Sequence, residues 1–65
     1  MLNVNNKIID EIKAIGLKIQ WIGEELRISG ISAIENGKDK VYEILKRNGF
    51  VGYIFVSNDF MDLIL

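Results

Sequence analysis

The stretch NGFVGYIFVS, residues 48–57, decides what kind of fold this chain of 65 residues can form. It is almost entirely apolar, which predicts a strand that offers neither face to water. Side chains alternate along a strand. One face therefore carries Val51, Tyr53 and Phe55, and the other carries Phe50, Ile54 and Val56. One of these faces must meet the core; the other needs cover from the connection at 31–36, from the tail or from a partner.

Helical and strand periodicities alternate along the chain. Apolar residues at helical spacing predict a helix over residues 4–15, and a second helix follows Asp39, which we expect to cap it. Between the helices, residues 17–22 and 26–29 alternate apolar and polar side chains around a Gly-containing turn, as a β-hairpin does. Trp21 has the phase of the apolar positions of its strand, so we expect it to pack in the core.

The tail, residues 58–65, fits a strand or a short helix equally well by periodicity. Both halves of the chain run helix, Gly, strand, polar turn and apolar segment, and this repeated pattern favours a strand. The predicted fold is α+β with the order αββαββ: a four-stranded, mainly antiparallel sheet with two helices on one face. A helical tail would give αββαβα instead.

Size and composition predict one small domain over residues 1–65. Apolar residues make up 49% of the chain and charged residues 26%, as in a folded globular protein. A domain this small buries only about 60% of its unfolded surface and often depends on disulfides, metals or association. The chain has no Cys and no His, so association is the expected support.

No catalytic or cofactor site is expected. Without His or Cys, neither a Ser-His-Asp nor a Cys-His arrangement exists. Carboxylate pairs occur at Asp10 with Glu11, Glu24 with Glu25, and Asp59 with Asp62, all on predicted exposed helix faces or turns. The ENGKD segment, residues 35–39, fits a turn and helix cap better than a calcium loop. We expect no enzyme, no metal and no cofactor.

A nucleic-acid interface is the alternative that the basic residues suggest. They are Lys38, Lys40, Lys46 and Arg47, at the start of the second predicted helix and along it. The net charge of the chain is −1, however, and nucleic-acid binders usually carry a basic excess. We therefore expect these side chains to form an ordinary solvated face and nucleic acid to be an improbable partner.

The segment IIDEIKAIGLKIQWIGEELRISG, residues 8–30, resembles the start of TubC-type N-terminal docking domains of peptide-synthetase assembly lines. It shares with them a short helix, a glycine, an alternating strand, a Gly-containing turn and a second strand. The resemblance implies a dimer whose hairpin receives an acidic peptide, with Lys18 and Arg27 at positions able to pair with it. The family continues with helices where this chain has GFVGYIFV.

The apolar excess of the long strand is the feature that points to function. Val51, Tyr53 and Phe55 are predicted to form a partner or dimer interface, because large apolar patches on protein surfaces usually mark interaction sites. The sequence thus favours a non-catalytic protein-interaction module that forms a homodimer. It would be a small regulator or inhibitor of a larger protein, of the type encoded by phages or mobile elements. No stretch approaches the ~18 apolar residues of a membrane span, which favours a cytoplasmic location.

Overall fold

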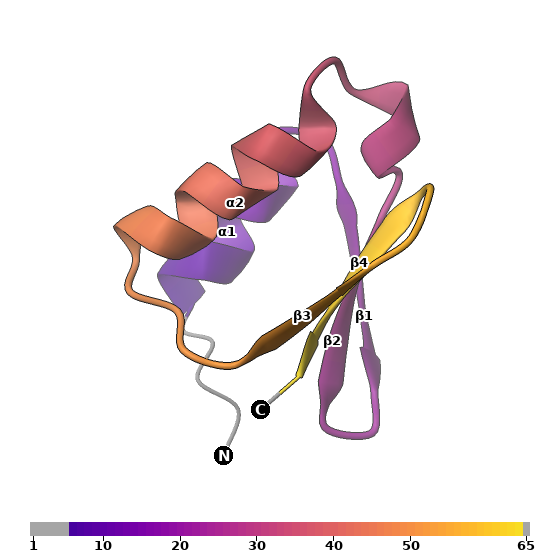
Figure 1. Cartoon of the computed structure of the whole chain (residues 1–65). Coiled ribbons are helices and arrows are strands. Elements are labelled where there is room, and N and C mark those ends of the chain that lie inside the picture. The colour runs from indigo at the N-terminus through magenta and orange to yellow at the C-terminus, as the bar shows by residue number, and fades with distance from the viewer. Residues whose placement is uncertain (1–5, 65) are drawn as a thin grey trace.

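Two α-β-β units follow each other along the chain, as a computed structural model of residues 6–64 shows (Figure 1). The elements are α1 (Asn6–Ala14), β1 (Lys18–Ile22), β2 (Glu25–Ser29), the short 3₁₀ helix η1 (Ile31–Ala33), α2 (Gly37–Arg47), β3 (Tyr53–Val56) and β4 (Phe60–Ile64). The predicted α+β order αββαββ is confirmed, and the tail is a strand. The first two residues of the predicted helix 4–15 lie outside the described residues.

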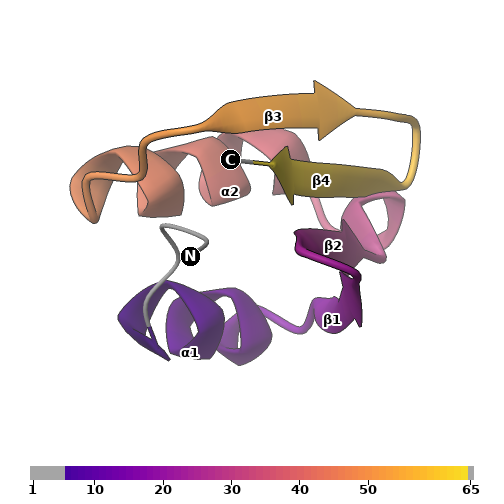
Figure 2. The same cartoon turned by 90° about the horizontal axis from the view of Figure 1, so that it is seen from below.

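The four strands form one antiparallel sheet in the order β1-β2-β4-β3. The second strands of the two hairpins therefore meet at the centre, where Arg27 is paired with Asp62 and Ile28 with Met61. Such an arrangement relates the two hairpins by an approximate two-fold rotation perpendicular to the sheet. Figure 2 shows β3 beside β4 and β2 beside β1. Strands β1 and β3 are the two edges.

Both helices lie on one side of the sheet, and the core fills the space between them and the strands (Figure 1). We call the side that faces the helices the inner face. Residues paired across antiparallel strands share a face. The fully buried side chains of the sheet, Leu26, Ile28, Met61 and Leu63, all belong to the inner face.

The opposite side is the outer face. Alternation and register assign to it Lys18, Gln20, Ile22, Glu25, Arg27, Ser29, Tyr53, Phe55, Phe60, Asp62 and Ile64. No element of residues 6–64 covers the aromatic side chains of β3 on this face. The tail is itself a strand of the sheet, and Ile31 of the connection is buried in the core cluster. The idea that the connection or the tail covers the second face of the long strand is therefore wrong.

Helix α2 begins three residues before the predicted position. Its N-cap is Asn36, whose φ of 56° is left-handed, and Gly37 opens the helix, so the expected cap at Asp39 is wrong. Asp39 lies in the first turn, where its negative charge interacts favourably with the positive end of the helix dipole. Asn and Gly are the residues that adopt such turns most readily, which is why the chain turns at this dipeptide.

The prediction that Trp21 packs in the core is wrong. Trp21 is 50% exposed. Its phase was correctly inferred: it pairs with buried Leu26 and so belongs to the inner face. It is, however, the next-to-last residue of an edge strand that runs into the turn, whereas Leu17, which directly precedes the strand, is buried. The core thus covers one end of β1 and leaves the end with the indole open to solvent.

Within residues 6–64, no helix has the length and apolar character needed to cross a membrane.

Candidate functional site

The most prominent surface feature is a group of apolar side chains on and beside β3. Val51, Tyr53 and Phe55 are 71%, 74% and 55% exposed, and Tyr53 and Phe55 lie on the outer face. The three residues predicted to form an interface are therefore all exposed. Their neighbours on the inner side of the chain, Phe50 and Ile54, pack against the core. The group is called the β3 patch below, and its role in binding stays a prediction.

A glycine sets the path by which the chain enters β3. Gly52 has a φ of 156°, and a Cβ atom there would lie 2.6 Å from the backbone oxygen of Ile64 and 2.9 Å from the ring of Phe50. Only a residue without a side chain fits so close to the end of β4. Phe50 can then turn toward the core while Val51 remains exposed.

An ion pair occupies the middle of the outer face. Arg27 on β2 donates from Nε to Oδ1 of Asp62 on β4 at 2.8 Å and from Nη2 to Oδ2 at 3.0 Å. This two-pronged geometry is the strongest that arginine makes with a carboxylate. Hydrogen bonding to Asp62 is the main cause that raises the pKa of Arg27. The centre of the face is thereby electrically neutral.

An aromatic ring lies against this pair. The guanidinium of Arg27 lies 4.0 Å from the centroid of the Phe60 ring, a cation–π distance. The Phe60 ring in turn lies 6.3 Å from the ring of Phe55. Arg27, Phe60 and Phe55 therefore connect the ion pair to the β3 patch in one continuous surface.

The prediction that Asp62 lies with Asp59 on an exposed surface is wrong for Asp62. It is only 5% exposed, because Arg27 covers its carboxylate on a face that is otherwise open. Strand alternation already put Phe60, Asp62 and Ile64 together. The pairing of β2 with β4 could not be predicted from the sequence. Only this pairing sets Asp62 opposite Arg27.

The two residues singled out for peptide binding, Lys18 and Arg27, do share the outer face. Lys18 is exposed on the edge strand β1. Arg27 already holds an acidic group of its own chain, so an acidic peptide would have to displace Asp62 to reach it. Of the two positive charges, only that of Lys18 has no ion-pair partner among the salt bridges of the described residues.

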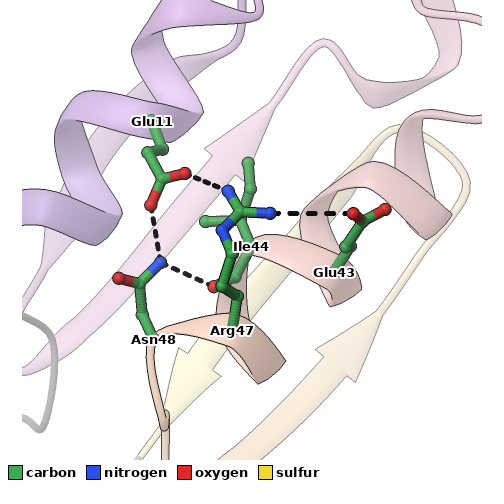
Figure 3. Close-up of polar contacts among 5 residues, drawn as sticks. All are labelled: Glu11, Glu43, Ile44, Arg47 and Asn48. Atoms are coloured by element: carbon green, nitrogen blue, oxygen red, sulfur yellow. Dashed lines mark hydrogen bonds and ion pairs between the residues drawn. The ribbon is translucent and has the colours of Figure 1, made fainter.

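The basic residues of α2 are exposed but mixed with acids. Lys38, Lys40, Lys46 and Arg47 all lie at the surface, as expected. Arg47 donates to Glu11 of α1 and lies 3.6 Å from Glu43 (Figure 3). A shallow groove of about 300 Å³ between the helices is lined by Lys40 and Arg47 together with both glutamates. The positive charges next to this groove are thus offset within the chain.

Two carboxylates, those of Glu11 and Asp59, accept hydrogen bonds from other elements, and these bonds lower the pKa of each carboxyl. Asn48 donates to Glu11 at 2.6 Å, and this bond, followed by that from Arg47, lowers the pKa of Glu11 (Figure 3). The side chain and the backbone N–H of Ser32 both donate to Asp59, which lowers the pKa of that carboxyl. Both carboxylates join elements far apart in sequence, which is a structural role.

Within residues 6–64, no group of three or more His, Cys, Asp or Glu side chains is placed to hold a metal ion. Comparisons with protein-family models, with curated proteins and with solved structures find no match to this chain.

Proposed function

We propose that this chain is a non-catalytic protein-interaction module that binds through the outer face of its β3–β4 hairpin. The observation that carries the proposal is the exposure of Val51, Tyr53 and Phe55 on a sheet whose other face is filled by the core. Exposed aromatic side chains that adjoin one another are typical of binding surfaces. The module acts by occupying a protein, either a second copy of itself or a larger protein that it regulates.

The chemistry of the outer face suits binding. Burial of an aliphatic or aromatic side chain contributes about 1.5–3 kcal/mol, so the three residues of the β3 patch supply enough to offset part of the cost of association. The ion pair of Arg27 and Asp62 is already formed. A partner can therefore cover the middle of the face without leaving an unpaired charge, which is the usual penalty for burying ionic groups.

The test compares two aromatic-to-acid substitutions. Tyr53→Glu places a charge in the β3 patch, and Tyr42→Glu places one on α2, where Tyr42 is also exposed. Tagged wild-type protein and both variants are incubated with lysate of the source cells, with nuclease and moderate salt, and bound proteins are identified by mass spectrometry. We expect one protein, either the chain itself or a larger target, to be retained by wild type and Tyr42→Glu and lost by Tyr53→Glu. Circular dichroism checks that all three are folded.

Two results would contradict the proposal. One is a partner that Tyr53→Glu and Val51→Glu both retain, which would place the interface elsewhere. The other is recovery of nucleic acid that is lost with nuclease or with added salt, because phosphate contacts weaken steeply with salt whereas an apolar interface does not. The second result would assign function to Lys38, Lys40 and Lys46 of α2.

A further inference from the structure

The two edges of the sheet differ in how well they are protected against pairing with another strand. Edge strands of natural proteins commonly carry charged residues, lysine above all, that discourage such pairing. Strand β1 follows this rule through Lys18. Strand β3 does not: residues 48–58 contain no charged side chain and no proline, in a chain with 26% charged residues.

The backbone of β3 has hydrogen-bonding groups directed at the open edge. The N–H of Ser57 donates to the carbonyl of Phe60 at 2.9 Å, which identifies this pair as a hydrogen-bonded one. Such pairs alternate with non-hydrogen-bonded pairs in antiparallel strands. Counting back from Ser57, Phe55 and Tyr53 bond to β4, while the N–H and C=O groups of Ile54 and Val56 point away from it.

We propose that the β3 edge is occupied by β3 of a second copy of this chain, in antiparallel orientation, so that two four-stranded sheets become one sheet of eight strands. The inference rests on the proposed function and names the partner for the same part of the molecule. A peptide from another protein is the competing occupant, and the experiment below separates the two.

The sequence of β3 complements itself. In the register that sets Ile54 opposite Ile54 of the second copy, each of these residues donates its N–H to the carbonyl of the other. Tyr53 then lies opposite Phe55 of the second copy on the outer face, and aromatic cross-strand pairs stabilise sheets. Val56 then lies opposite Gly52 of the second copy, the residue before that strand begins. No like charges meet, and a two-fold dimer is the commonest assembly of identical chains.

The contact area indicates a weak dimer. Four residues of strand extend about 13 Å, and the surface buried by one such edge is well below the roughly 800 Å² per partner of a typical stable interface. We therefore expect the dimer to form reversibly in the micromolar range or above, and the experiment must cover a wide range of protein concentration.

The test measures association and edge pairing separately. Analytical ultracentrifugation gives the fraction of dimer, and amide hydrogen exchange followed by nuclear magnetic resonance is recorded at concentrations below and above the dimer midpoint. The amides of Ile54 and Val56 should exchange rapidly in the monomer and slow in proportion to the fraction of dimer. The amides of Tyr53 and Phe55, which bond to β4, serve as internal references for intact folding.

A backbone modification provides the matched control. N-methylation of Ile54 by chemical synthesis removes one edge N–H and leaves every side chain in place, so it should abolish the dimer. The same modification at Trp21, whose amide faces the other open edge by the alternation counted from the tight turn at Gly23–Glu24, should leave the dimer intact.

Each outcome decides a different point. A dimer in which the Ile54 and Val56 amides stay unprotected would overturn the β3 pairing but keep the interaction function, since the copies would then meet by another surface. A monomer at millimolar concentration would overturn self-association outright. The proposed function would then be judged only by whether Tyr53→Glu loses a different captured protein.

Discussion

At the scale of single residues, the two partners of the Arg27–Asp62 ion pair differ in how much stability their removal should cost. The carboxylate of Asp62 is buried, whereas the guanidinium of Arg27 is partly exposed. Removal of Arg27 thus leaves a buried charge without its partner, while removal of Asp62 leaves a cation that still reaches water. An unpaired buried charge is the more costly of the two.

We expect Arg27→Met to lower the free energy of unfolding more than Asp62→Asn does. The double variant Arg27→Met/Asp62→Leu should recover stability relative to Arg27→Met, because neither charge is then present. Urea unfolding at neutral pH measures all three. Equal losses for the two single variants would show that Asp62 reaches solvent without its partner.

Trp21 supports a second prediction at this scale. Because the indole is half exposed, Trp21→Ala should cost about 1 kcal/mol, well below the ~3–5 kcal/mol typical of a buried tryptophan. Leu26, which is paired with Trp21 and fully buried, is the comparison: Leu26→Ala should cost about 2–5 kcal/mol. Urea titrations rank the two, and a larger loss for Trp21→Ala would place the indole in the core.

At the scale of elements, the junction between η1 and α2 depends on a close approach. A Cβ atom at Gly37 would lie 2.5 Å from the backbone oxygen of Ile31 and 2.9 Å from its side chain. Gly37→Ala should therefore destabilise the fold by about 1–3 kcal/mol, as overpacking does, although alanine is the better helix former. Lys38→Ala, one residue along and exposed, should be nearly neutral. Thermal unfolding of the two variants gives the comparison.

The hydrogen-bonded carboxylates of Glu11 and Asp59 predict how the free energy of unfolding depends on pH. The pKa values of Glu11 and Asp59 are lowered in the folded chain from their ordinary values of 4.5 and 3.8. The folded state therefore binds fewer protons than the unfolded state. The stabilisation by both carboxylates is complete above these ordinary values, and it is lost as the pH falls through the lowered values.

Stability should accordingly fall below about pH 4.5. Glu11→Gln should reduce stability at pH 7, and the difference from wild type should narrow as the pH falls below 4.5 toward the lowered pKa of the native carboxylate. Glu24→Gln, in the exposed β1–β2 turn, serves as the control and should follow the wild-type profile. Urea midpoints measured from pH 3 to pH 7 test this, and a difference that does not change with pH would contradict it.

At the scale of the whole molecule, association is expected to support a small fold. A species that binds only the folded state raises its apparent stability by mass action, so the melting temperature should rise with protein concentration. Tyr53→Glu and N-methylated Ile54 should remove this dependence, and Tyr42→Glu should keep it. Differential scanning fluorimetry and calorimetry over a hundredfold range of concentration provide the measurement. A melting temperature independent of concentration in the wild type would contradict self-association.

Local patterns in the chain determined its elements. The spacing of apolar residues predicted both helices and all four strands, and the repeated α-β-β pattern predicted that the tail is a strand. These predictions succeeded because periodicity within a segment reflects which of its own faces is buried. The apolar run also raised the question of what covers the second face of β3, and the exposure of Tyr53 and Phe55 answers it.

The three-dimensional fold was needed to show which segments are neighbours. The pairing of β2 with β4 brings Arg27 to Asp62 across 35 residues of sequence, and it leaves β3, the uncharged strand, at an edge. The exposed position of Trp21 has the same origin, because a residue's phase selects its face and the placement of the helices selects which part of that face is covered. Register, strand order and helix placement depend on contacts between distant segments, and periodicity within one segment carries no information about them.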